Sequence, residues 1–164
     1  MQFSLFNKPF RVKLTSPIGF VGERSISEGD DLPVYVHTTS ASLVNIYFLG
    51  KTKELVESLP EISPQHQDNR YSPIDGFDWE RSFLVPTTSY RSGYYLIELK
   101  DKETNREYQI PFIVKPRKTA RVAVIASTNT WQAYNAYGGR SNYRDTQTPV
   151  LRKGIKRTLR VLGN

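Results

Sequence analysis

The feature that most constrains the fold is a series of short apolar or alternating runs through residues 8–116, each closed by turn residues. Six or seven such runs recur about every 10–12 residues, which is typical of strands in an antiparallel sheet protein. In Leu32–Thr38, for example, Leu32, Val34 and Val36 share one face of the expected strand. The spacing predicts a mainly β fold, an immunoglobulin-like antiparallel β-sandwich over residues 8–116.

The inward faces of these runs predict a core of large aliphatic and aromatic side chains. Pro111 lies inside the last run and removes a backbone donor, which predicts an edge position or a bulge there. Residues 51–75 have mixed polarity and are expected to form a long loop with a short helical turn at Lys53–Ser58. The expected core members are Leu32, Val34, Val36, Leu43, Ile46, Phe48, Trp79, Phe83, Tyr95, Ile97, Phe112 and Val114.

The pattern changes after Pro116, where Ala120–Ala126 reads ARVAVIA. A nearly contiguous apolar run of this kind is typical of a strand buried on both faces in a parallel α/β sheet. The polar run Ser127–Thr130 then offers caps for a helix beginning near Trp131. Residues 117–164 are therefore expected to be the start of an incomplete α/β domain, which needs a missing domain, a subunit or a second copy of the chain to complete it.

Composition excludes several kinds of site. The chain has no cysteine, which excludes a disulfide framework, a thiolate nucleophile and a cysteine-bound zinc, and two histidines cannot form a three-histidine metal site. His37 and His66 have no G-x-S-x-G serine nearby, so both are expected to be ordinary polar surface residues. No apolar run approaches the roughly 18 residues of a membrane span, and no signal peptide is recognisable, so a cytoplasmic protein is expected.

Charge is concentrated at one end. Residues 117–164 hold 10 of the 23 Lys and Arg but one of the 16 acids, a net of +9, which leaves −2 for residues 1–116. Within Val150–Leu162 the apolar residues fall on one face of a basic helix. An alternative function is therefore a non-enzymatic interaction module whose residues 152–160 bind a protein or, less favoured because aromatic residues are missing there, nucleic acid.

The densest group of polar and aromatic residues is Ser127–Tyr143, STNTWQAYNAYGGRSNY. It follows the expected buried strand, where α/β sheets place binding and catalytic groups. The two glycines Gly138 and Gly139 would let the backbone approach a ligand closely. Large aromatic residues in an incomplete domain also favour self-association through residues 120–164.

Within this segment, Asn129–Ser141 resembles the NTWQAYN-x-(W/Y)GG-x-S signature of the N,N-dimethylformamidase large-subunit family. Three shorter stretches resemble the β-sandwich that precedes the catalytic domain in that family: Gly76-Phe77-Asp78-Trp79, Ser92-Gly93-Tyr94-Tyr95 and Ile110-Pro111-Phe112-Ile113-Val114. The resemblance covers residues 8–145.

The resemblance implies an amidohydrolase with a glutamine-amidotransferase-like α/β domain and a mononuclear iron held by two tyrosines and a glutamate. Tyr134 matches the first tyrosine, which makes it the candidate metal ligand. By resemblance alone, the candidate catalytic residues are Tyr134, Asn129, Trp131 and Asn135.

The resemblance places the other two iron ligands further along the α/β domain, but no tyrosine follows Tyr143 and no acid follows Asp145, so this sequence is not expected to complete the iron site. We therefore expect a truncated or partial relative that binds no cofactor by itself and is inactive alone, with the sandwich as an accessory or assembly module. Removal of residues 117–164 should leave that sandwich folded.

Overall fold

The computed structural model describes residues 10–12, 14–72, 76–118 and 121–130. The chain divides into two compact units. The larger unit comprises Thr15–Gln67 and Trp79–Arg121, and the other comprises Met1–Leu14, Asp68–Asp78 and Val122–Asn164. No helix among the described residues is both long and apolar enough to cross a membrane.

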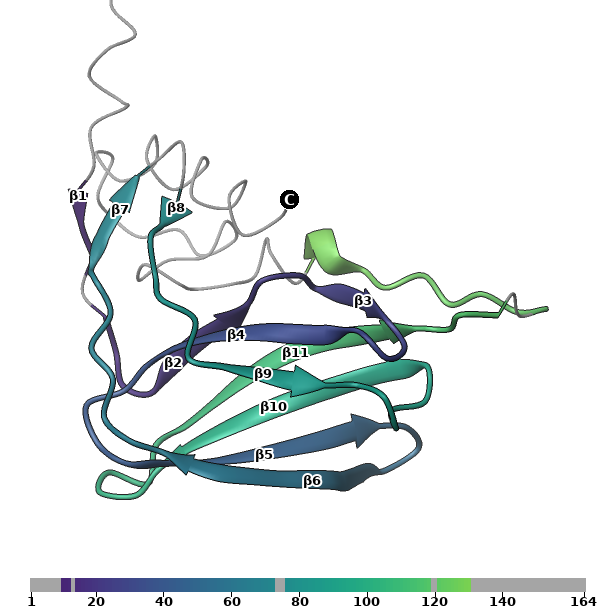
Figure 1. Ribbon diagram of the computed structural model, residues 1–164, viewed down its shortest axis with the longest axis horizontal. Helices are drawn as coiled ribbons and strands as arrows, with labels where there is room; N and C mark the ends of the chain where they lie inside the picture. The colour runs from purple at the N-terminus through teal and green to yellow at the C-terminus, as the bar shows by residue number, and fades with distance from the viewer. Residues whose placement is uncertain (1–9, 13, 73–75, 119–120, 131–164) are drawn as a thin grey trace, which may run out of the picture. The chain divides into compact units, whose positions relative to one another are not determined.

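The larger unit is built from two sheets (Figure 1). The smaller sheet has the order β2-β4-β9, and the larger has the order β3-β11-β10-β5-β6. All neighbouring strands are antiparallel except β3 and β11, which are parallel. The bounds are β2 (Ile18–Val21), β3 (Ser25–Ser27), β4 (Asp31–His37), β5 (Ser42–Leu49), β6 (Lys53–Ile62), β9 (Phe83–Pro86), β10 (Gly93–Asp101) and β11 (Glu107–Lys115).

These strand orders are those of an immunoglobulin-like sandwich, A-B-E in one sheet and A′-G-F-C-C′ in the other. A second hallmark is a tyrosine corner at the start of β10, where the Tyr95 hydroxyl donates to the Arg91 carbonyl oxygen at 2.7 Å. The predicted β-sandwich fold is therefore confirmed, although Asp68–Asp78 and the residues before Thr15, which fall inside the expected span of residues 8–116, belong to the other unit. Pro111 pairs with β10, whereas β3 pairs only with Ile113–Lys115, so the proline occupies a stretch of β11 with a neighbour on one side.

The core lies between the inner faces of the two sheets. Leu32, Val34 and Val36 of β4 are fully buried against residues of the larger sheet such as Ile46 and Ile97. Aromatic rings fill the part near the tyrosine corner: the Tyr95 ring stacks on Tyr90 and Phe112, with centroids 5.0 and 5.3 Å away.

Nine of the twelve predicted core residues are buried, and Phe48 and Phe83 are half-buried at the border of the core. The prediction for Leu43 was wrong, because this side chain is 41% exposed. Side chains alternate along a strand, and β5 turns Ser42, Val44 and Ile46 inward, so Leu43 must point outward.

The long loop predicted over residues 51–75, with a helical turn at Lys53–Ser58, was also wrong, since Lys53–Ile62 form the strand β6. Lys, Glu and Leu favour helices by themselves, but pairing with β5 decides the conformation here. Two register shifts interrupt the β5–β6 ladder, and β6 is the edge of its sheet. Such irregularities and the strand's charges discourage edge-to-edge association.

The other unit contains a small antiparallel sheet of β1 (Phe10–Arg11), β7 (Arg70–Ser72) and β8 (Gly76–Phe77), in the order β1-β7-β8. The Tyr71 and Phe77 rings meet edge to face with centroids 5.0 Å apart. The Val12 amide also donates to the Asn69 carbonyl oxygen at 2.8 Å.

The buried strand predicted at Ala120–Ala126 is not formed. Val122, Val124 and Ile125 are 78%, 77% and 92% exposed, and no strand of the described chain pairs with them. An apolar run becomes a buried strand only where neighbouring strands and a covering layer exist. We call residues 121–130 the exit segment; its last residues, 128–130, are helical, slightly before the predicted helix start.

Candidate functional site

The exit segment carries the one predicted catalytic residue whose position is described. Asn129 is exposed and belongs to the helical residues 128–130. The Thr128 amide donates to the Ala126 carbonyl oxygen at 2.9 Å just before it. Trp131, Tyr134 and Asn135 lie outside the described residues, as do Gly138, Gly139 and the basic residues 152–160.

The chain leaves the sandwich through Arg117, two residues after β11. Its guanidinium donates to the Glu28 carbonyl oxygen and lies 3.9 Å from the Asp30 carboxylate. Gly29 has a φ of +89°, a conformation that favours glycine, and its missing side chain leaves room for the Arg117 guanidinium, since a Cβ there would lie 2.8 Å from Nη2. The first part of the path toward the exit segment is therefore fixed to the sandwich.

A cluster of rings that the sequence did not predict lies on the outer face of the smaller sheet. We call it the aromatic cluster: Phe20, Tyr35, His37, His66 and Trp79. Phe20 stacks on Tyr35 at 5.0 Å and tilts against Trp79 at 5.1 Å, measured between ring centroids. His37 lies 6.3 Å from the Trp79 ring and 5.6 Å from the His66 ring. The alternation of β4 places Tyr35 and His37 on one face, but only the fold brings the other three rings to them.

Gln67 joins this cluster to two backbone segments. Its side-chain amide nitrogen donates to the carbonyl oxygens of Val36 at 3.1 Å and Glu80 at 2.8 Å. Its side-chain oxygen accepts from the Glu80 amide at 3.0 Å. The Gln67 backbone amide donates to His37 Nδ1 at 3.1 Å. One glutamine thus makes four hydrogen bonds that hold the loop after β6 against β4 and the segment before β9.

The histidine prediction holds for one residue only. His66 is exposed, but His37 is 8% exposed and was wrongly expected at the surface. Burial first, and the neighbouring His66 second, lower the pKa of His37 below its usual 6.5. The hydrogen bond from Gln67 likewise requires an unprotonated Nδ1, so the buried ring is neutral.

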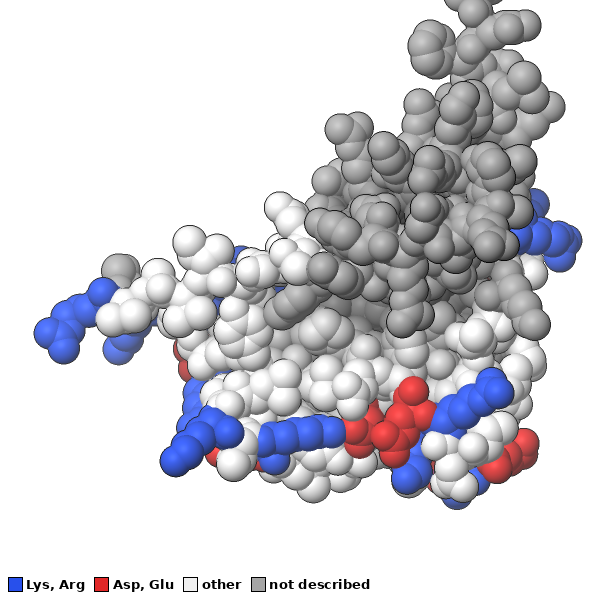
Figure 2. Space-filling model, turned by 180° about the vertical axis from the view of Figure 1, so that it is seen from behind, with Lys and Arg blue, Asp and Glu red and all other residues white. Residues whose placement is uncertain are grey.

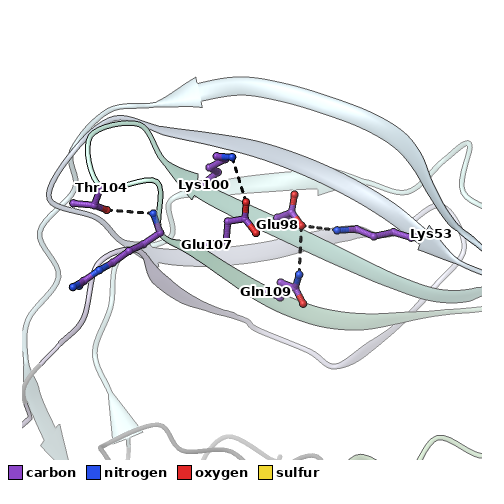
Figure 3. Close-up of polar contacts among 7 residues, drawn as sticks. Lys53, Glu98, Lys100, Thr104, Glu107 and Gln109 are labelled. Atoms are coloured by element: carbon purple, nitrogen blue, oxygen red, sulfur yellow. Dashed lines mark hydrogen bonds and ion pairs between the residues drawn. The ribbon is translucent and has the colours of Figure 1, made fainter.

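The outer face of the larger sheet carries a group of polar side chains that bond to one another across the strands, as Figure 3 shows. Glu98 of β10 accepts hydrogen bonds from Lys53 of β6 and, at 3.4 Å, from Gln109 of β11. Burial alone would raise the pKa of Glu98, but the Lys53 ammonium and the hydrogen bonds outweigh it, and the pKa is lowered. Lys100 of β10 and Glu107 of β11, which lie opposite each other in the sheet, form a second ion pair with 3.3 Å between the Lys100 Nζ and Glu107 Oε1 atoms.

In both cross-strand pairs the acidic side chain is neutralised by a lysine. Figure 2 shows Lys or Arg next to Asp or Glu side chains along one face of the molecule. The exposed pairs, such as Lys100 and Glu107, contribute little stability each, about 0–1 kcal/mol. Because the Glu98 carboxylate is already bound by Lys53 and Gln109, it is not available as a general acid or base.

Asp101 closes the opposite end of β10. Its carboxylate is fully buried and accepts from the Ser40 hydroxyl and from the backbone amides of Glu103 and Thr104 at 3.0 and 2.8 Å. The Ser40 hydrogen bond first, and the Thr104 amide next, lower the pKa of Asp101 to about 2. The residue stabilises the β10–β11 turn as a permanent anion.

A metal site of His, Asp and Glu is not formed among the described residues, where no group of three or more gathers. Tyr134, the candidate iron ligand, lies outside them. We therefore derive no step through iron.

Comparison with known proteins places the chain in a family. A family model described as N,N-dimethylformamidase beta subunit-like, C-terminal, matches residues 44–163. The match begins in β5, takes in β6, β9, β10 and β11 of the sandwich, and continues through the exit segment and the NTWQAYN run. No curated protein matches the chain. Since the matched region is most of the sequence, this chain belongs to the N,N-dimethylformamidase beta subunit-like family.

Proposed function

We propose that this chain is a partial relative of an amidohydrolase of the N,N-dimethylformamidase type, in which the β-sandwich serves as an accessory or assembly module. The observation that carries the proposal is the family match, which takes in five sandwich strands and the NTWQAYN run as one stretch. Because the sandwich and the NTWQAYN run fall within one family match, we infer that the sandwich supports or positions that run.

The polar groups of the sandwich support a structural role for it. The carboxylates of Glu98 and Asp101 are occupied by partners within the sheet. The Tyr90 hydroxyl donates to Glu57 at 2.8 Å, and burial, followed by that hydrogen bond, raises the pKa of Tyr90 strongly. A phenol locked in this way is a poor general acid near neutral pH, because an effective catalytic group has a pKa close to the working pH.

The reactive part of the proposal is assigned to the NTWQAYN run. Tyr134 is the proposed iron ligand, and Asn129, Trp131 and Asn135 are the proposed neighbours of the amide substrate. The resemblance places the two further iron ligands later in the α/β domain, where this sequence has no tyrosine after Tyr143 and no acid after Asp145. On this proposal the chain by itself does not hydrolyse amides.

An assay of amide hydrolysis tests the proposal. The purified 164-residue chain is incubated with Fe²⁺ and with formamide or N,N-dimethylformamide, and release of formate is followed. We expect no turnover and no stoichiometric iron. A complete member of the family serves as the positive control. Turnover by the chain alone, with one iron per chain, would refute the proposal.

A complementation experiment tests the accessory role separately. A family member that lacks both its own sandwich and its own NTWQAYN run is mixed with the full chain or with its Tyr134→Phe variant. Increased turnover with the full chain supports an assembly role. If activity rises only with the parent chain, Tyr134 takes part in the reconstituted site; equal activity with both variants would contradict the ligand assignment. No gain with either would contradict the assembly role.

A further inference from the structure

The chain crosses between the two units at two places that lie next to the aromatic cluster. It leaves the larger unit after Gln67 and returns to it at Trp79. Gln67 and Glu80 are linked by a pair of hydrogen bonds in which the glutamine amide both donates, at 2.8 Å, and accepts, at 3.0 Å. A single side chain therefore ties the outgoing crossing to the returning one.

The outgoing crossing is also fixed to the end of β4. Thr38 and Gln65 exchange two backbone hydrogen bonds of 3.0 and 2.9 Å. One step further, the Gln67 amide donates to His37 Nδ1 at 3.1 Å. An imidazole nitrogen accepts only while it is unprotonated; when both nitrogens carry protons, both are donors. The second anchor thus depends on the charge of His37, whereas the first does not.

The groups around His37 make a charge on it unfavourable. From β2, Ile18 pairs with it in the sheet and carries no charge. From the returning crossing, the Trp79 ring packs beside it and is 6% exposed. From the outgoing crossing, the titratable His66 ring lies 5.6 Å from the His37 ring, measured between centroids. The acids of the two crossings, Asp68, Asp78 and Glu80, are exposed to solvent.

We propose that His37 and Gln67 form a proton-sensitive clamp, which holds the two crossings together when His37 is neutral and releases them when it is protonated. This device goes beyond the proposed function. Protonation turns the Nδ1 acceptor into a donor that faces the Gln67 amide, and it places a positive charge beside His66. The segment between the crossings, which contains β7 and β8, then loses the link that joins its two ends.

The sign of the pH effect follows from the lowered pKa of His37. In the opened state the ring is in water and its pKa returns toward 6.5. The opened state therefore binds more protons than the closed one as pH falls below about 6.5, and opening becomes easier. At pH 7.5 both states are neutral at His37 and the clamp is closed.

Amide hydrogen exchange by NMR on the full chain tests the clamp. Between pH 7.5 and 5.5 we expect the protection factors of the Gln67 and Glu80 amides, corrected for the intrinsic rate, to fall by about tenfold. The Lys102 amide, which donates to the Ala41 carbonyl oxygen at the far end of the sandwich, is the internal control and should not change. Unchanged protection at Gln67 and Glu80 over this range would overturn the proposal, and so would an equal loss at Lys102.

Two variants separate the clamp from a purely structural histidine. His37→Asn keeps an acceptor near the position of Nδ1 but cannot be protonated, so the pH dependence at Gln67 should disappear. His66→Asn removes, at an exposed position, the neighbouring imidazole that helps to lower the pKa of His37, so the midpoint of the loss should move to higher pH. If His66→Asn leaves the midpoint unchanged and His37→Asn keeps the wild-type pH dependence, His37 does not control the crossings.

Discussion

Two runs of alternating valines, one in β4 and one in the exit segment, have opposite environments. Val34 and Val36 are completely buried, whereas Val122 and Val124 are 78% and 77% exposed. Their local sequences are similar: each has β-branched residues at every second position. The comparison shows that β-propensity decides little until a strand has neighbours to pair with.

The neighbours of β4 account for the difference. It pairs with β2 on one side and β9 on the other, and its inner face packs against the larger sheet. Burial of a valine, leucine or isoleucine side chain contributes about 1.5–3 kcal/mol. Residues 121–126 have no such pairing within the described chain, so their apolar side chains contribute nothing comparable to its stability.

The largest effect is expected from a pair of truncations, one in each region. Phe112→Ala removes a ring that is fully buried against Tyr95, and we expect the free energy of unfolding to fall by about 3–5 kcal/mol. Ile125→Ala, in a side chain that is 92% exposed, should change it by less than about 0.5 kcal/mol. Urea denaturation followed by tryptophan fluorescence measures both.

The comparison would break if the two variants behaved alike. A loss of several kcal/mol in Ile125→Ala would mean that the exit segment is packed as tightly as the sandwich. A small loss in Phe112→Ala would mean that the core between the two sheets does not carry the stability of the larger unit.

A smaller and pH-dependent effect is expected at Asp101. Its pKa is lowered to about 2 in the folded chain, against about 3.9 in an unfolded one. Its stabilisation is therefore present above about pH 4 and is lost as pH falls through about 2. Asp101→Asn should cost about 1.5–3 kcal/mol at pH 7, the range for hydrogen bonds to a charged group.

Urea denaturation at pH 7 and pH 2.5 measures this dependence. The difference between Asp101→Asn and the parent should shrink at the lower pH. Glu103→Gln, a change at an exposed neighbouring acid, is the matched control and should leave both values unchanged. A difference that stays constant with pH would show that Asp101 acts by shape and not by charge.

The sandwich was largely predictable because apolar side chains recur at every second position along its strands. The alternation in β4 and β10 identifies Val34, Val36, Tyr95 and Ile97 without reference to the structure. The errors fall where this local signal fails: β6 has helix-forming residues and is a strand only because it pairs with β5.

The family and the candidate site could be predicted only from one sequence motif. The NTWQAYN run pointed to the family that the comparison then matched over residues 44–163. The aromatic cluster gave no comparable signal, because Phe20, His66 and Trp79 come from three distant stretches and meet only in the folded sheet. The environment of Trp131, Tyr134 and Asn135 lies outside the described residues and stays a prediction.

The most direct test of the central claim, that the sandwich is a self-sufficient module, is the thermal unfolding of a chain that ends at Arg121. This end point keeps Arg117, whose guanidinium donates to the Glu28 carbonyl oxygen. A cut before residue 117 would remove that hydrogen bond. We predict one cooperative transition with a Tm within about 3 °C of the full chain, and less self-association in analytical ultracentrifugation. Loss of the cooperative transition would contradict the account, because residues 122–164 would then be a structural part of the same folding unit.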